Sequence, residues 1–450
     1  MIRQWYRESQ GACGVENQSL QSDRCDSGGV DRDNGGVYRR AFMIGSGFFT
    51  VALIEPMYSA YVPLMLADYL HSSVGVGAVL SALNLIAPAV IPVFSTLSDR
   101  TVTRIGRRMP YIVTFLPLAA LALALVPIAA RLSLTALVGV LAAMNFFRHA
   151  ARGPIVALMP DLVPREQRSQ ANGVINTMGG LAAITATVFL APLIGVQLTL
   201  PVIGAVTRVV PFWFIALLVV SATLFLFNTV REPVRSPGGD PGAKRHGRVR
   251  VFSALAAVVR SGRSGALPIL LAVVLWFLGW KLMTPFISLY VRDYLRAGEA
   301  AAGFSFGVLA LALTSFAVPG GVIAARLGRR RVMCWALLML AVFGLAAFCN
   351  HRLALQSDVA GLYPFWATLF GFGIAWSVLI TNCLPMLWDR AGPNAVGLYT
   401  GLYYFASQTA LVAGPGVGGV IVEFAGFGGL FLAFSSVMLA AFVLLRQSRL

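Results

Sequence analysis

Three ionisable side chains stand deep inside long apolar stretches of the sequence: Glu55, Arg148 and Lys281. A charge at the centre of a membrane-spanning helix costs roughly 2.5–3.5 kcal/mol on insertion scales, so each of the three needs a partner or a function. Glu55 is followed by Pro56, which is expected to break or kink a helix locally. A titratable carboxylate in such a place is a candidate proton carrier.

Polar residues at helical spacing accompany Arg148. Asn145, Arg148, His149 and Arg152 share one face of a helix, which must turn away from lipid. The planar guanidinium of Arg148 can bind hydroxyls or an anionic group. The alternative is that Arg148 pairs with an acid of its own half, such as Glu55, as scaffold. His149 is either a hydrogen-bonded spacer or a proton carrier.

Composition places these residues in a membrane protein. The chain has 450 residues, 58% hydrophobic and 12% charged, which is about half the charged fraction of a soluble domain. The five cysteines show no CxxC pair and no spacing that suits zinc, so we expect no metal, no cofactor and no disulfide framework. No HExxH, GxSxG or Cys/His set is present, so an enzyme is not expected.

The net charge of +17 is explained by topology. With the N-terminus inside, 28 of the 35 Lys and Arg fall in inside segments and 5 outside, as the positive-inside rule predicts. A nucleic-acid partner is therefore not needed, and no obligate protein partner is evident. We expect a cell membrane protein (inner or plasma membrane) with both termini cytoplasmic. The five outside residues are Arg131, Arg208, Arg292, Arg296 and Arg352.

Apolar runs of about 20 residues predict twelve membrane helices. They cover residues 41–66, 74–97, 110–130, 133–158, 172–195, 208–230, 266–291, 301–324, 332–350, 361–386, 396–422 and 427–446. The predicted organisation is a disordered cytoplasmic tail (1–40), a six-helix bundle (41–230), a basic Pro/Gly-rich linker (231–265), a second bundle (266–446) and a short cytoplasmic end (447–450). The tail has no apolar region typical of a signal peptide.

Internal repeats support two equivalent bundles. The sequence ADYL at 67–70 returns as RDYL at 292–295, and GRR at 106–108 returns at 328–330, offsets of 225 and 222. A third pair, 160–173 and 385–397, agrees. The fold class expected is an all-α membrane protein of two pseudo-symmetric six-helix bundles.

The loop from Ser95 to Tyr111 carries Asp99 among four arginines between the second and third predicted helices. The acid can accept hydrogen bonds from arginines and from a helix N-terminus, and so latch the two halves on the inner side. The second copy has Ala325 in place of the acid, so the latch is expected on one side only. The alternative is that the arginines only set topology.

This loop resembles the signature G-x-L-x-D-R-x-G-R-R of the major facilitator superfamily. The matching residues are Leu97, Asp99, Arg100, Gly106, Arg107 and Arg108; Ser95 stands where glycine is usual, and three extra residues precede GRR. The longer form, and the segment 152–173 with Asp161 and Arg168, resemble the glycoside-pentoside-hexuronide cation symporters and related sucrose and proton-sugar transporters. The resemblance implies a cytoplasmic gate at these residues and says little about the substrate.

In that architecture the first helix of each bundle lines a central cavity. The repeat places Trp280, with Lys281 beside it, at the position equivalent to Glu55. Glu55 and Lys281 either pair across the cavity until a proton or substrate competes, or form a permanent salt bridge. The second helix carries Asn84 and no acid, which favours proton over sodium coupling, because sodium needs a shell of hard oxygen ligands.

Aromatic and amide side chains supply further cavity candidates, which can stack on or hydrogen-bond to a sugar but more often serve as packing. They are Trp276, Trp280, Tyr290, Trp376, Asn382, Tyr399, Tyr403 and Gln408. The glycine run at 414–419 is expected to allow close helix packing.

The favoured hypothesis is a secondary active transporter in the lipid bilayer that moves a small sugar-like solute with protons by alternating access. Alternatives are a proton-driven exporter of amphipathic compounds and a membrane sensor of the same fold that does not transport.

Overall fold

The computed structural model describes residues 34–163, 168–200, 204–232, 267–354, 361–390 and 396–448. The predicted tail up to residue 33, nearly all of the predicted linker, and residues 449–450 lie outside the described residues. Helix α2 begins at Asn34, earlier than predicted, and continues to Leu70 across Pro56 and Pro63.

The first half contains the described helices of the first predicted bundle. They are α2 (Asn34–Leu70), α3 (Ser73–Asn84), α4 (Ile86–Arg100), α5 (Met109–Leu132), α6 (Leu134–Leu162), α7 (Arg168–Ile184) and α8 (Val209–Thr229). The second predicted helix is interrupted at Leu85, because Pro88 has no N–H and its ring would clash with the carbonyl of Asn84. A π-helical turn, η2 (Thr185–Phe189), extends α7.

An antiparallel hairpin joins η2 to α8 through the short 3-10 turn η3 (Ala191–Leu193). Strand β1 (Leu198–Leu200) pairs with β2 (Gly204–Val206), with Leu198 opposite Val206. The predicted helices leave residues 196–207 unassigned, and no strand is predicted there, because two three-residue strands are too short for a periodic pattern to stand out.

The second half repeats the arrangement. Its helices are α10 (Leu267–Leu289), the π-helical η5 (Tyr290–Tyr294), α11 (Gly298–Leu327), α12 (Arg329–Ala354), α13 (Leu362–Arg390) and α14 (Val396–Gln447). α14 holds the last two predicted helices, divided at Gly426, where φ is 68° and a residue without a side chain is favoured.

Ten of the described helical segments are long and apolar enough to cross a membrane. One of them, Gly401–Gln447, is the segment that Gly426 divides, and Thr177–Phe189 is a shorter apolar helix. If the segment divided at Gly426 is counted as two crossings and Thr177–Phe189 as one more, the described helices are consistent with the twelve predicted crossings.

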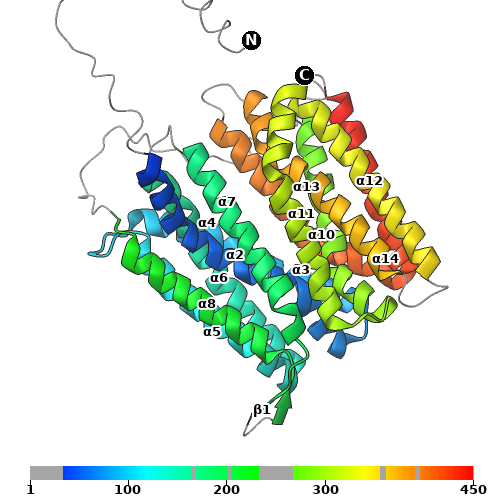
Figure 1. Ribbon diagram of the computed structural model, residues 1–450, viewed down its shortest axis with the longest axis horizontal. Helices are drawn as coiled ribbons and strands as arrows, with labels where there is room; N and C mark the ends of the chain where they lie inside the picture. The colour runs from blue at the N-terminus through cyan, green and yellow to red at the C-terminus, as the bar shows by residue number, and fades with distance from the viewer. Residues whose placement is uncertain are drawn as a thin grey trace, which may run out of the picture.

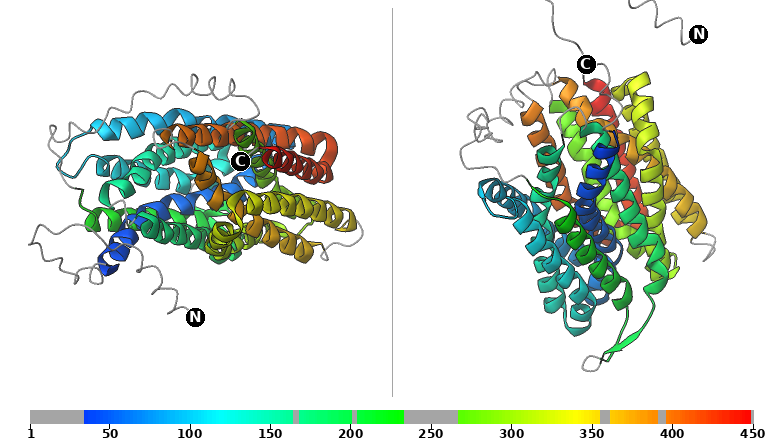
Figure 2. Two further views of the ribbon diagram at one scale, coloured as in Figure 1. Left: turned by 90° about the horizontal axis from the view of Figure 1, so that it is seen from above. Right: turned by 60° about the vertical axis from the view of Figure 1, so that its left-hand side comes forward.

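The two halves stand side by side, with α3 and α7 of the first half lying between the bundles (Figure 1). The start of α2 and the end of α14 lie at one end of the molecule, here called the terminus side, and the β1–β2 hairpin lies at the opposite end, the hairpin side (Figures 1 and 2). α3 packs on α14 and α7 packs on α11, so these pairs join the halves.

Glycines bring the halves into backbone contact on the hairpin side. A Cβ added at Gly77 would overlap the carbonyl of Pro415, and one at Gly419 would overlap the carbonyl of Ser73. Gly414 and Gly418 face the backbone of α10 in the same way. The expectation that the glycine run allows close packing is confirmed.

Replacement of Gly77 by valine is therefore expected to destabilise the joined hairpin side, because the backbone of Pro415 cannot move aside as a side chain would. Overpacking of this kind costs about 1–3 kcal/mol. Thermal unfolding in detergent should show a lowered midpoint for Gly77→Val. Gly401→Val on α14, where an added Cβ meets nothing within 4 Å, is the control. Equal midpoints for the two variants would contradict the packing argument.

Candidate functional site

Glu55 lies at the centre of the molecule between cations from both halves. Its Oε2 accepts a hydrogen bond from Nη1 of Arg148 on α6 at 2.5 Å, and its Oε1 lies 3.8 Å from Nζ of Lys281 on α10. The side chain of Arg148 is buried, whereas that of Glu55 is 42% exposed. The structure thus brings together the three charges that the sequence singled out, with Arg148 in the same half as Glu55 and Lys281 in the other.

Neighbouring polar groups fix the guanidinium of Arg148. Its Nη2 donates to Oδ1 of Asn145 at 2.8 Å, and lies 3.4 Å from Nε2 of His149. Asn145 in turn donates to the carbonyl of Leu141, and the ring of Tyr58 lies under the guanidinium at 5.4 Å. Asn145 and His149 are themselves buried, and their contacts with Nη2 orient the guanidinium of Arg148.

A cavity of about 30 Å³ adjoins this cluster, large enough for about one or two water molecules. Both halves line it with polar and apolar groups: Glu55, Tyr58, Ser59, Pro63, Leu80, Asn84, Lys281, Thr284, Pro285, Leu411 and Pro415. Asn84 donates to the carbonyl of Leu411 and so links α3 to α14 at its wall.

An aromatic group stands beside Lys281 in the second half. Trp280 stacks on Trp376 of α13, with ring centres 4.3 Å apart and planes at 8°. Phe277 contacts both Trp376 and Tyr403 edge to face. Trp280 is partly exposed, whereas Trp376 and Tyr403 are buried, so Trp280 is the most accessible of these three rings.

Other predicted cavity residues lie elsewhere or are engaged in packing. Asn382 is buried and donates to the carbonyls of Val378 and Gly320, where it links α13 to α11. Trp276 is fully buried, and Tyr290 lies among the rings of Tyr294, His351, Phe365, Phe427 and Phe431. Tyr399 and Gln408 are partly exposed on α14.

Arg108 is the centre of the predicted gate on the terminus side. Its Nη2 lies 3.0 Å from Asp99 at the end of α4, and its Nε donates to Asp161 at the end of α6 at 2.5 Å. Arg107 pairs with Asp161 at 2.7 Å, while Arg100 is exposed. Arg168 begins α7, and its side chain is outside the described residues.

Sequence reasoning missed the acid that completes this gate. Oε2 of Glu232, which follows α8, accepts hydrogen bonds from the backbone N–H of Arg108 at 2.9 Å and of Met109 at 3.3 Å. It therefore caps the positive N-terminus of α5. Gly106 has a φ of 111°, and a Cβ there would overlap Glu232, which explains the glycine of the motif. The ion pairs of these gate residues, among the described residues, all lie within the first half.

Truncation of Arg108 is expected to destabilise the first half, because two carboxylates from different helices lose their shared buried partner. A hydrogen bond to a charged group contributes about 1.5–3 kcal/mol. Arg108→Ala should therefore lower the free energy of unfolding by at least the value of one such bond, about 1.5–3 kcal/mol. Chemical denaturation in detergent measures the change. Arg104→Ala, an exposed arginine in the same loop, should be nearly neutral. A loss no larger than that of Arg104→Ala would be incompatible with the role given to Arg108.

A second charge network closes the hairpin side, and it joins the halves. Asp68 of α2 pairs with Arg292 of η5 at 2.7 Å and with Arg208 at 2.9 Å. Arg208 also donates to both carboxylate oxygens of Glu299 on α11, through its Nε and Nη2. Burial lowers the pKa of Arg208, but the hydrogen bonds and charges of Glu299 and Asp68 outweigh it and raise the pKa above the ordinary arginine value. This cation therefore stays charged at every physiological pH.

Local backbone geometry aims Arg208 at its partners. Arg208 follows β2 and precedes α8 with a left-handed φ of 69°, which is unusual for a residue with a side chain. The hairpin thus ends in a turn that carries the linking guanidinium.

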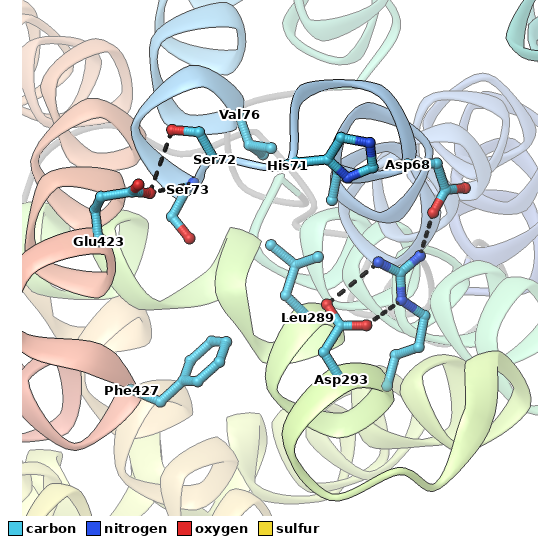
Figure 3. A pocket seen from close by; sticks show the side chains of 11 residues that line it. Asp68, His71, Ser72, Ser73, Val76, Leu289, Asp293, Glu423 and Phe427 are labelled. Atoms are coloured by element: carbon cyan, nitrogen blue, oxygen red, sulfur yellow. Dashed lines mark hydrogen bonds and ion pairs between the residues drawn. The ribbon is translucent and has the colours of Figure 1, made fainter.

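Glu423 of α14 makes a third link on this side. Its carboxylate accepts hydrogen bonds from the backbone N–H of Ser73 at 2.7 Å and from the hydroxyl of Ser72 at 3.2 Å, so it caps α3 from the other half (Figure 3). A pocket of about 550 Å³ lies between this link and the pair of Arg292 with Asp293 (Figure 3).

A known protein family and several solved structures match this chain over most of its length. The family described as MFS/sugar transport protein matches residues 43–445, and the chain belongs to that family. No curated protein matches the sequence.

Three solved structures are similar over nearly the whole chain, each at 14% identity. They are a mutant of the nucleoside transporter NupG (TM-score 0.71, covering 92% of this chain and 100% of that one), a bacterial homologue of the iron transporter ferroportin in an inward-facing state (0.65, 92% and 99%) and a bacterial metal transporter (0.60, 91% and 97%). At this identity they show the fold alone. The protein is a multi-pass membrane transporter of the major facilitator superfamily.

Proposed function

We propose that the protein is a secondary active transporter that carries a small polar solute, of the sugar or glycoside type, together with a proton by alternating access. The observation that carries the proposal is the position of Glu55 between Arg148 of one half and Lys281 of the other. A site shared by two halves at mid-depth is where a rocking transporter binds its solute.

Glu55 is the proposed proton carrier. When it is ionised, its carboxylate neutralises Arg148 directly and Lys281 at longer range. A proton on Glu55 removes that attraction, which frees both cations for the solute and weakens the link between the halves. The ionisable groups that act on Glu55 are Tyr58, Arg148, His149, Arg152 and Lys281.

The ion pairs at the two ends of the molecule are those expected of one stage of the alternating-access cycle. Ion pairs join the halves on the hairpin side, while the gate residues of the terminus side pair within the first half. With the termini in the cytoplasm, as the charge distribution predicts, this is an inward-open stage. The latch of Asp99 between the halves remains a prediction for the opposite, outward-open stage.

Transport by the purified protein in proteoliposomes tests the proposal. An inward-directed proton gradient should drive accumulation of a labelled sugar, and a proton ionophore should abolish it. Exchange of labelled for unlabelled sugar should continue without a gradient. Proton-driven loss of amphipathic compounds would instead identify an exporter, and binding without exchange would identify a sensor; either result would contradict symport.

A further inference from the structure

The centre of the protein holds more positive than negative charge. Arg152 lies one helical turn from Arg148 on α6, towards the terminus side, and its side chain is exposed. Its charge acts on Glu55 and Arg148, and also on Lys281. We call Glu55, Arg148, Arg152 and Lys281 the central charge cluster. It has three cations and one carboxylate, which leaves two positive charges in excess.

No second carboxylate is available to this cluster within the part of the chain that the structure describes. The other described acids of the membrane-spanning segments stand at helix ends, and Asp161 and Glu232 belong to the gate. The end-standing acids are Asp68, Asp99, Asp293, Glu299 and Glu423. Excess charge at mid-membrane marks a functional site by default, because it is costly and needs compensation.

A solute can reach the cluster. Glu55 is 42% exposed and the side chain of Lys281 is 23% exposed, although both lie in the middle of membrane-spanning segments. Tyr404 of α14, which is 52% exposed, lies within the electrostatic reach of Arg152 from the opposite half. Exposed groups of both halves, Arg152 on α6 and Tyr404 on α14, therefore stand near the cluster.

We propose that the transported solute is an organic anion that carries one carboxylate or phosphate group, which the three cations of the central charge cluster bind. This specifies the substrate class and rests on the proposed function. The planar guanidinium of Arg152, which is exposed, can form a forked contact with such a group, and Lys281 supplies a point charge beside Trp280.

Proton and anion then occupy the site together. The proton adds to the carboxylate of Glu55, so Arg148 and Lys281 lose their anionic partner, and the anionic group of the solute takes its place. With a singly charged solute, one proton and one negative charge cross together, and the complex carries no net charge across the membrane. A neutral sugar with a proton would instead carry one positive charge.

Charge-selective labelling tests the excess of positive charge without any transport. The reporter is Tyr404→Cys in a protein whose five native cysteines are replaced by serine. It is labelled in detergent with an anionic sulfonate methanethiosulfonate and, separately, with a cationic trimethylammonium one. Electrostatic focusing in a cleft raises local ion concentration tenfold or more. The ratio of the anionic to the cationic labelling rate at Tyr404→Cys should therefore be at least ten times the same ratio for free cysteine in solution. Arg152→Gln should reduce that preference, and Arg131→Gln, an exposed arginine on the hairpin side, should not.

Binding tests the substrate class. The thermal unfolding midpoint is measured with glucuronate against glucose, and with glycerol 3-phosphate against glycerol, so that each pair isolates one anionic group. At least one anion should raise the midpoint, with its neutral counterpart at least tenfold weaker, and Lys281→Gln should remove the effect. The pair that responds identifies carboxylate or phosphate.

The proposal is overturned if both labelling reagents behave as they do with free cysteine, if the neutral compounds stabilise the protein equally, or if neither anion stabilises it. Neither measurement depends on transport. A protein that passes both tests but accumulates no solute would therefore contradict the proposed function and leave the anion site standing.

Discussion

Replacement of Glu55 by glutamine is expected to abolish proton-driven accumulation while solute exchange continues. Glutamine has the shape of the protonated acid but cannot release or bind a proton, so the solute no longer depends on the pH gradient. A gradient of one pH unit represents about 1.4 kcal/mol, or roughly tenfold accumulation for one proton. The wild-type protein should approach that ratio in proteoliposomes, and Glu55→Gln should stop at equal concentrations inside and outside.

Glu55→Asp is the matched control, because it keeps a titratable carboxylate one methylene farther from Arg148. It should accumulate the solute more slowly but still above equilibrium. Full accumulation by Glu55→Gln would remove Glu55 from the coupling mechanism, and would favour the reading of Glu55 and Arg148 as permanent scaffold.

Replacement of Arg208 by glutamine is expected to open the hairpin side. Arg208 holds Asp68 of the first half and Glu299 of the second, and its loss leaves two carboxylates without their common cation. If the closed form is stabilised over the open form by one charged hydrogen bond of Arg208, worth about 2 kcal/mol, loss of that bond should raise the ratio of open to closed protein about 30-fold. Ser59→Cys, in the wall of the central cavity, reports the change through its labelling rate by an impermeant maleimide added from the hairpin side.

Arg131→Gln provides the comparison, because Arg131 is an exposed arginine at the same end of the molecule. It should leave the labelling rate of Ser59→Cys near that of the parent protein. If Arg208→Gln labels no faster than Arg131→Gln, the ion pairs of the hairpin side do not hold the halves together.

The membrane class and the two-bundle fold could be predicted from the sequence, because apolar length, positive charge on one side and internal repeats are all one-dimensional signals. The same offset of 225 residues placed Trp280 at the position equivalent to Glu55, with Lys281 beside it, and Nζ of Lys281 lies 3.8 Å from Oε1 of Glu55. Buried charges are informative because so few residues can tolerate that environment.

The hairpin-side network could not be predicted in the same way. Asp68, Arg208, Glu299 and Arg292 lie at helix ends, where charges are ordinary, and they are separated by up to 231 positions in the sequence. Their pairing depends on how the two halves tilt against each other, which is a property of the conformational state. One signal was available: several charges cluster at the ends of repeat-equivalent helices, in ADYL and RDYL.

The aromatic candidates show the limit of residue type as a guide. Trp280 and Trp376 stack beside the central charge cluster, but Trp276 is enclosed and Asn382 binds backbone carbonyls. All four were consistent with a cavity lining, because helical spacing says which residues share a face and not which face meets water.

Infrared difference spectroscopy of the purified protein during a pH titration tests most directly whether Glu55 carries the coupling proton. We predict that lowering the pH produces a carboxylic acid carbonyl band in the wild-type protein that is absent in Glu55→Gln and retained, at a shifted frequency, in Glu55→Asp. A pH difference spectrum of Glu55→Gln that matches the wild type would contradict the central claim, because the proton would then bind elsewhere.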